Sequence, residues 1–287
     1  MNNSYLKNIF RAGIIGIFFL LGGVYISAQN VDSLSLAFDY IQRNHLDSAE
    51  IALKAVLESK PDNPVNPFLL NNLGTVQRRM GKLEEALLSY TAALGTFPKQ
   101  LVFLEARASL FAEMGQPQNA IIDYTSLLDE RPNDQDALYQ RGLLYLQIKN
   151  TDLAEADFRR MLDLNPKSLY ARRGFASVAK FRGDYDSAEK IYNYLLDKEP
   201  QDFNLYAGRA ELYLLMVRPG KAYDDINQAI HLAGGDKSTN PYLYVIRYRI
   251  KLLLHEKQGA IDDLNKAIAL GYKEEEAAPT TPATPQE

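Results

Sequence analysis

The sequence has 287 residues, of which 46% are apolar and 24% charged, a balance typical of a soluble globular protein with enough apolar material for a core. Its formal net charge is −4 and it has no run of five or more basic residues, so we expect no nucleic-acid partner. The absence of cysteine excludes disulfides, thiolate nucleophiles, cysteine-ligated zinc and iron–sulfur clusters.

The first 28 residues have the pattern of an export signal. Lys7 and Arg11 precede an apolar run over residues 12–26, and the small residues Ser27 and Ala28 follow it. We therefore expect a signal peptide over 1–28, export to the periplasm or cell envelope, and no membrane insertion after cleavage. The alternative is an uncleaved inner-membrane anchor, but a run of about 15 residues is shorter than the roughly 20 needed to span a bilayer.

A repeat fills most of the remaining chain. Its marker is an alanine, found at Ala49, Ala86, Ala120, Ala154, Ala188, Ala222 and Ala260, and the five inner alanines are each 34 residues apart. A small residue stands 12 positions before most of these alanines, an aromatic or aliphatic residue stands 4 after each, and a proline stands 12 after the first five. A fixed period of this length indicates a stack of similar structural units.

Each period reads as two short amphipathic helices. Apolar residues recur at three- and four-residue spacing on both sides of a polar or glycine-containing turn. These turns are expected near Gly81, Gly115, Asn150, Gly183 and Gly220. Two joins are longer than the others, and both end in Asn-Pro, which predicts that Asn66 and Asn240 cap the helices that follow.

The spacing and residue types resemble the tetratricopeptide repeat family. That resemblance implies an all-α, right-handed superhelical solenoid of seven helix-turn-helix units over residues 29–272. The expected units are 30–66, 67–100, 101–134, 135–168, 169–202, 203–240 and 241–272. The last unit departs from the pattern, because Tyr248 stands where the small residue belongs and no proline closes it. Residues 273–287 are rich in Glu, Pro and Thr, which predicts a disordered tail.

An arginine and an aspartate recur together in four units. The arginine directly precedes the small position, and the aspartate directly precedes the position four after the alanine, so the two are 16 residues apart. The pairs are Arg107 with Asp123, Arg141 with Asp157, Arg209 with Asp225, and Arg247 with Asp263. The other three units have neither residue. We therefore expect structural ion pairs that join the two helices of a unit.

Resemblance to the family also implies a concave groove, lined by the first helix of each unit, that binds an extended peptide or a helix of a partner protein. The groove-facing positions combine polar residues with aromatic anchors. They are Asn71, Thr75, Arg78, Glu105, Ser109, Tyr139, Tyr170, Arg173, Ser177, Asn204, Glu211, Tyr242 and Arg249.

No residue pattern predicts catalysis, a cofactor or a metal. His45, His231 and His255 each fall near a predicted turn or helix end, and no nucleophile or metal-ligand motif accompanies them. We therefore expect a non-enzymatic scaffold or adaptor. One alternative is an assembly component that self-associates through its last helix, where Ile261 and Ile268 have core-like spacing with only the tail after them. Another is a glycan-binding or hydrolytic accessory protein, since aromatic and polar side chains also hold sugars.

Overall fold

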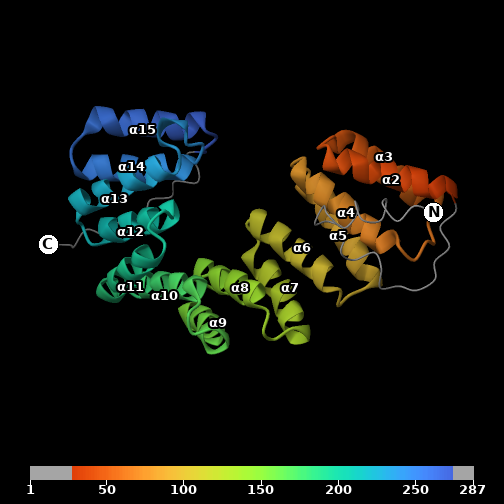
Figure 1. Cartoon of the computed structure of the whole chain (residues 1–287), viewed down its shortest axis with the longest axis horizontal. Coiled ribbons are helices and arrows are strands. Elements are labelled where there is room, and N and C mark those ends of the chain that lie inside the picture. The colour runs from red at the N-terminus through yellow and green to blue at the C-terminus, as the bar shows by residue number, and fades with distance from the viewer. Residues whose placement is uncertain (1–27, 274–287) are drawn as a thin grey trace. The chain divides into compact units, whose positions relative to one another are not determined.

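The computed structural model describes residues 28–273 (Figure 1). This range contains fourteen α-helices, one short 3-10 helix and no strand, so the prediction of an all-α repeat fold is confirmed. The expected signal peptide and tail lie outside the described residues, apart from Ala28 and Lys273.

The α-helices follow one another as seven consecutive pairs. The pairs are α2 (Ala28–Gln42) with α3 (Leu46–Ser59), α4 (Asn66–Arg79) with α5 (Leu83–Thr96), α6 (Leu101–Glu113) with α7 (Pro117–Glu130), α8 (Gln135–Gln147) with α9 (Thr151–Leu164), α10 (Leu169–Phe181) with α11 (Tyr185–Lys198), α12 (Phe203–Leu215) with α13 (Pro219–Leu232), and α14 (Pro241–Leu253) with α15 (Lys257–Ala269). The 3-10 helix η2 (Gly235–Lys237) lies in the long join before α14.

The chain divides into two compact units, residues 1–137 and 138–287, whose boundary falls inside α8. Within unit 1, helix α3 packs on α4 and α5 packs on α6. Within unit 2, helix α9 packs on α10, α11 on α12 and α13 on α14, and Figure 1 shows α11 to α15 stacked in chain order. Within each of the two compact units, a helix pair therefore packs against the next pair, as expected of a repeat array.

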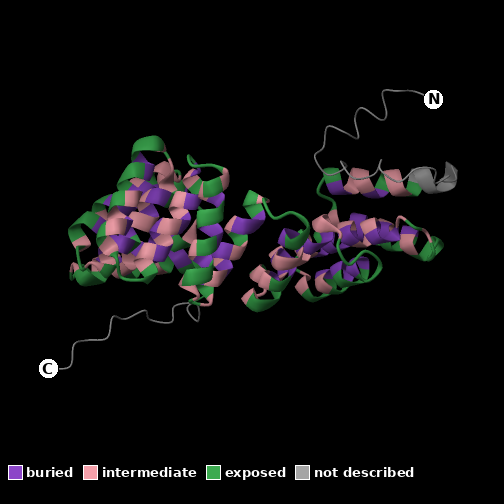
Figure 2. Ribbon diagram, turned by 90° about the horizontal axis from the view of Figure 1, so that it is seen from below, coloured by how far each residue is buried: buried purple, intermediate pink, exposed green. Residues whose placement is uncertain are grey.

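Small residues allow an aromatic ring to fill the space between helices. The Phe158 side chain is fully buried, and a Cβ atom on Gly142 or on Gly174 would lie 2.6 or 2.5 Å from the Phe158 ring. Glycine is therefore required on both sides of this ring. Figure 2 shows buried residues recurring along the helices, with exposed residues concentrated at the helix ends and turns.

Side-chain caps begin several helices of unit 2. The side chains of Asn150, Ser168, Asp184 and Asp202 each accept a hydrogen bond from a backbone N–H of the first turn. Asn240 caps α14 in the expected way, by accepting from the backbone N–H of Tyr242 at 3.1 Å.

The predicted cap at Asn66 is wrong. Asn66 is the first residue of α4, and its side-chain nitrogen donates to the carbonyl oxygens of Lys60 and Pro61 at 2.7 and 2.8 Å. The side chain therefore holds the preceding loop instead of satisfying the helix N-terminus. The shared Asn-Pro dipeptide gave no indication of this difference.

The turn inside each pair has one residue in the left-handed region. This residue is a glycine at Gly81, Gly115 and Gly183, but it is Asn44, Lys149, Val217 and His255 in the other pairs. The left-handed residues Lys149 and Val217 lie one and three positions before Asn150 and Gly220, near which turns were expected. Asn150 caps α9, and Gly220 lies in the first turn of α13. A β-branched residue such as Val217 is rare in this conformation.

Throughout residues 28–273, each helix is too short or too polar to cross a bilayer.

Candidate functional site

The four arginines with a recurring aspartate each bind that aspartate through two hydrogen bonds. The distances from arginine Nε and Nη2 to the two carboxylate oxygens are 2.8 and 2.8 Å for Arg107–Asp123, 2.9 and 2.7 Å for Arg141–Asp157, 2.7 and 2.7 Å for Arg209–Asp225, and 2.9 and 2.6 Å for Arg247–Asp263. All four aspartates are buried, whereas the arginines are partly buried. Paired, hydrogen-bonded charges of this kind join the two helices of one helix pair.

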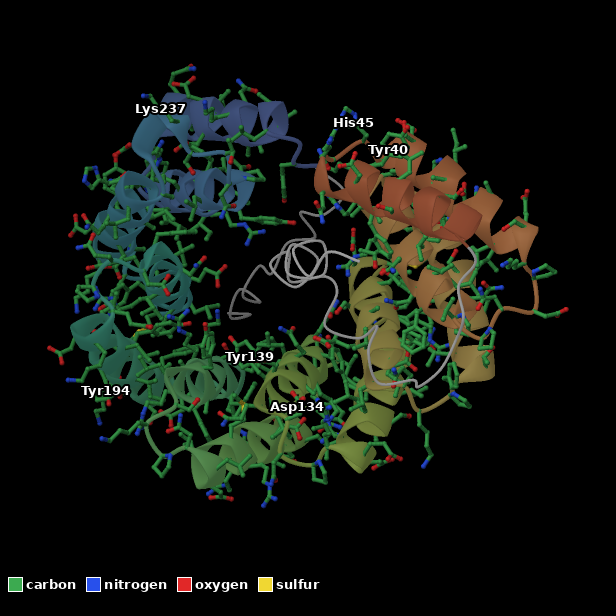
Figure 3. The ribbon with its side chains drawn as sticks, turned by 45° about the vertical axis from the view of Figure 1, so that its right-hand side comes forward. Tyr40, His45, Asp134, Tyr139, Tyr194 and Lys237 are labelled. Carbon is green, nitrogen blue, oxygen red and sulfur yellow. The ribbon has the colours of Figure 1, made fainter. Side chains whose placement is uncertain are left out.

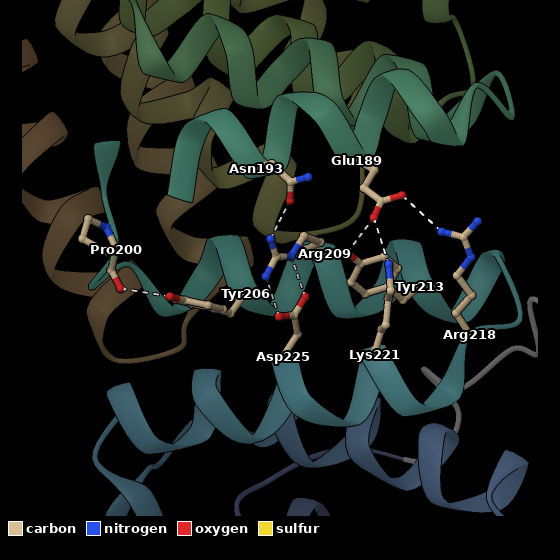
Figure 4. A network of polar contacts seen from close by, with 9 residues as sticks. All are labelled: Glu189, Asn193, Pro200, Tyr206, Arg209, Tyr213, Arg218, Lys221 and Asp225. Carbon is tan, nitrogen blue, oxygen red and sulfur yellow. Dashed lines mark hydrogen bonds and ion pairs between the residues drawn. The ribbon is translucent and has the colours of Figure 1, made fainter. Parts of the chain in front are cut away.

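Arg209 is the centre of a larger polar network in unit 2 (Figure 4). Its Nη1 donates to Asn193 Oδ1 of α11 at 2.6 Å, and its hydrogen bonds to Asp225 raise the pKa of the guanidinium. Beside it, the Tyr213 hydroxyl donates to Glu189 Oε1 at 2.8 Å. Burial and this hydrogen bond raise the pKa of Tyr213 to about 12. The network therefore joins α11, α12 and α13, and the Nε, Nη1 and Nη2 atoms of Arg209 each donate within it.

An aromatic ring accompanies each of these guanidinium groups. The Cζ atoms of Arg107, Arg141 and Arg209 lie 5.7, 5.7 and 5.8 Å from the ring centroids of Phe111, Tyr145 and Tyr213, four residues later in the helix. The Cζ atom of Arg247 lies 5.6 Å from the Tyr244 ring. The sequence prediction missed these contacts, although the four-residue spacing was a visible signal.

The predicted groove residues of unit 1 are mostly engaged within the protein. Arg78 Nε donates to Glu113 Oε2 at 2.5 Å, and the hydroxyls of Thr75 and Ser109 contact core tyrosine hydroxyls at 3.1 and 3.2 Å. Asn71 is buried, and its Oδ1 accepts no hydrogen bond from the described residues. Burial, with help from Asp134 and Asp136, raises the pKa of Glu105.

The structure brings Tyr139, Tyr170 and Arg173 together on α8 and α10 of unit 2. The rings of Tyr139 and Tyr170 meet edge to face with centroids 5.5 Å apart, and Arg173 Cζ lies 5.5 Å from the Tyr170 ring. Tyr170 is exposed, whereas burial raises the pKa of Tyr139. Figure 3 shows Tyr139 on the inner side of the curved unit and Tyr194 on its outer side. These three residues form an aromatic and basic cluster that a ligand can contact.

The other groove positions of unit 2 are less connected to this cluster. Glu211 accepts from Lys180 Nζ at 2.8 Å, and the ring of Tyr242 meets the ring of Tyr272 with centroids 6.1 Å apart. Ser177 donates to the backbone oxygen of Arg173 at 3.3 Å. Asn204 is exposed and Arg249 is half-buried.

Acidic residues on neighbouring helices bind two of the groove arginines, Arg78 and Arg173. Arg173 donates to both Glu199 and Asp202, so its positive charge is already balanced inside unit 2. These partners, like Glu113 and Lys180, were missed by the sequence prediction. The signal for them is a separation near one repeat, 35 residues for Arg78 to Glu113 and 31 for Lys180 to Glu211.

The described residues include no group of three or more His, Asp or Glu side chains placed to hold a metal ion. The arrangement they do present, an exposed tyrosine beside a paired arginine on adjacent helices, supports noncovalent contact with another molecule.

Comparison with known proteins identifies similar chains. Residues 105–168 match a family model described as tetratricopeptide repeat. The chain is 44% identical to a tetratricopeptide repeat protein from Parabacteroides merdae ATCC 43184, with a TM-score of 0.81, covering 87% of this chain and 96% of that one.

Two more distant solved structures share the fold. PilW, described as a widely conserved type IV pilus biogenesis factor, is 18% identical with a TM-score of 0.58, covering 74% of this chain and 97% of its own. The pilF protein of Pseudomonas aeruginosa is 18% identical with a TM-score of 0.56, and the match covers 79% of this chain and 97% of pilF. No curated protein matches the chain at a significant level.

Proposed function

The chain belongs to the tetratricopeptide repeat family, and from that premise we propose that it is a non-enzymatic scaffold that binds a protein or peptide in the cell envelope. Repeat folds of this family are generally interaction scaffolds without catalytic activity. The proposed location is supported by the export-like pattern of residues 1–28.

The observation that carries this proposal is the cluster of Tyr139, Tyr170 and Arg173 in unit 2. Tyrosine and arginine are enriched among the interface residues that contribute most to binding energy. Arg173 keeps its planar face over Tyr170 while Glu199 and Asp202 neutralise its charge. The cluster therefore suits a ligand with an apolar or aromatic side chain better than an anionic one.

The test is a crosslinked pull-down from intact cells with two matched variants. The groove variant combines Tyr139→Ala, Tyr170→Ala and Arg173→Ala. The control combines Arg172→Ala and Tyr194→Ala, which removes an outer-face pair whose Arg172 Cζ lies 5.0 Å from the Tyr194 ring.

We expect a partner that the wild type and the control retain and the groove variant loses, with both variants folded by circular dichroism. If the groove variant retains the partner, the cluster of Tyr139, Tyr170 and Arg173 is not the binding site. Conversion of an envelope polysaccharide by the purified protein would favour the glycan-directed alternative.

A further inference from the structure

The last helix exposes two isoleucines on the face where a further repeat would dock. Ile261 and Ile268 of α15 are 50% and 45% exposed. Neither belongs to the apolar cluster that includes Ala267 and Tyr272 and packs against Leu264. The two side chains are seven residues apart, so they lie on one side of the helix.

The inner repeats show what covers this face when another helix pair follows. Ile268 is equivalent to Leu196 of α11 and Ile230 of α13, which are only 8% and 5% exposed. Leu196 shares a cluster with Leu205 and Leu212 of α12, and Ile230 shares one with Leu243 and Ile250 of α14. In both cases the covering helix contributes two apolar residues seven positions apart.

Residues 274–287 do not have an apolar pair of this kind. After Lys273 the sequence is EEEAAPTTPATPQE, which has no large apolar residue. A segment of this composition has too little apolar area to shield two isoleucines.

The first helix of another copy does not fit the face either. Counted by the repeat, the positions of Leu69 and Val76 in α4 correspond to Asp32 and Asp39 in α2. Asp39 is partly exposed and paired with Arg43 at 3.1 Å. Docking α2 on α15 of another copy would bury the Asp39 carboxylate against isoleucine, which is costly. Open head-to-tail chains are therefore opposed by the sequence of α2.

Helix α15 itself has two apolar residues seven positions apart, as the helices that cover this face in the inner repeats do. Among the exposed large apolar residues between positions 28 and 273, Ile261 and Ile268 are the only two that are seven apart in one helix. In an antiparallel pair of α15 helices with its two-fold axis between Leu264 and Asn265, Ile261 of one copy would contact Ile268 of the other. The two-fold axis repeats this contact, so all four isoleucines would be covered.

We propose that two copies of this protein associate through an antiparallel contact between their α15 helices, centred on Leu264 and Asn265. The contact covers the end of the repeat array and closes on itself, so the assembly stops at two chains. It leaves the Tyr139, Tyr170 and Arg173 cluster out of the contact, and the proposal does not depend on the function proposed for that cluster.

The first test measures mass by sedimentation equilibrium over a concentration series. We expect the wild type to approach the mass of two chains, and Ile268→Glu to remain at the mass of one. The matched control is Ile51→Glu on α3, which changes a 70% exposed isoleucine in unit 1, and this variant should dimerise as the wild type does. A wild type that stays monomeric, or an Ile268→Glu variant that still dimerises, would overturn the proposal.

The second test uses the absence of cysteine from the chain. Asn265→Cys lies next to the two-fold axis and should form a disulfide between copies under mild oxidation. Gln258→Cys lies about 10 Å along the helix from the axis, so its two copies are about 20 Å apart and should not crosslink. Crosslinking of Gln258→Cys as fast as Asn265→Cys would show that the antiparallel register is wrong. Capture of a different protein by Ile261 and Ile268 with no dimer would show that the second copy is the wrong occupant.

Discussion

Asp157 shows how a buried charge acts at the scale of one residue. It lies in α9 and accepts two hydrogen bonds from Arg141 of α8, which satisfies both carboxylate oxygens. An ion pair of this kind adds little compared with two well-packed apolar residues, but loss of one member leaves the other charge partly buried and unpaired. The pair therefore matters most when it is broken.

We predict that Asp157→Ala lowers the free energy of unfolding by about 3 kcal/mol. Adding Arg141→Leu should recover much of this loss, because the unpaired guanidinium is then removed. Urea denaturation of the wild type, both single variants and the double variant gives the coupling energy. A coupling energy near zero would contradict a structural role for the pair.

A second prediction concerns Glu50, a buried carboxylate of α3. It accepts hydrogen bonds from Lys54 at 2.7 Å, Lys82 at 2.6 Å and Gln77 at 3.2 Å. The hydrogen bonds from Lys54 and Lys82 lower the pKa of Glu50 to about 2. Because the folded-state pKa is below the unfolded value, the stabilisation is complete above the unfolded pKa near 4.5 and is lost as the pH falls towards 2.

Glu50→Gln should therefore cost roughly 1–3 kcal/mol at neutral pH, as expected for charged hydrogen bonds. The difference from wild type should shrink as the pH falls from 4.5 to 2. The measurement is denaturant unfolding at several pH values, with Glu58→Gln as an exposed control on the same helix. A cost that stays constant over this pH range would show that the charge of Glu50 does not stabilise the fold.

At the scale of elements, the turn between α12 and α13 is less favourable than the equivalent turns. Its left-handed residue is Val217, with φ of 53°, where three other pairs have Gly81, Gly115 and Gly183. A β-branched residue in this region is strained, whereas glycine adopts it freely. Val217 is also exposed, so replacing its side chain removes little packing.

We predict that Val217→Gly raises the free energy of unfolding by about 0.5–1 kcal/mol, the relief of strain exceeding the extra entropy of glycine in the unfolded chain. The reciprocal Gly183→Val should lower it. Thermal or urea unfolding of both variants measures the two effects. A destabilised Val217→Gly would mean that the valine side chain stabilises the turn in some other way.

The helices were predictable from the sequence because the same residue pattern recurs in successive repeats. The helix pairs and the sixteen-residue spacing of arginine and aspartate both follow from constant positions within the period. Features that occur at one join only were not predictable. Asn66 turns back to the preceding loop, because this contact depends on the local backbone and rotamer.

The candidate site was predictable only in part, for a related reason. The family geometry indicates which positions face the groove, but not whether a charged residue there is already paired. Arg78 has Glu113 as a partner, and Arg173 has Glu199 and Asp202. Glu113 belongs to the next helix pair, whereas Glu199 caps the end of α11 and Asp202 caps the start of α12. The charge offered to a ligand therefore depends on neighbouring helices as well as on the groove residue.

At the scale of the whole molecule, the two ends of the repeat array differ in chemistry. Helix α2 has Asp39 where α4 has the buried Val76, whereas α15 keeps Ile268 where α13 has the buried Ile230. Terminal repeats of such arrays are stabilised from one side only, so both end helices should open more easily than inner ones. Self-association through α15 removes this weakness at one end and leaves it at the other.

We therefore predict that amide hydrogen exchange in α15 slows as the protein concentration rises, while exchange in α2 stays unchanged. The reason is mass action, because the dimer covers α15 and its opening then requires dissociation. Exchange measured by mass spectrometry at low and high concentration, with Ile268→Glu as the monomeric reference, separates this effect from general crowding. Equal slowing in α2 and α15 would mean that the two ends respond alike and that the difference between Asp39 and Ile268 does not direct association.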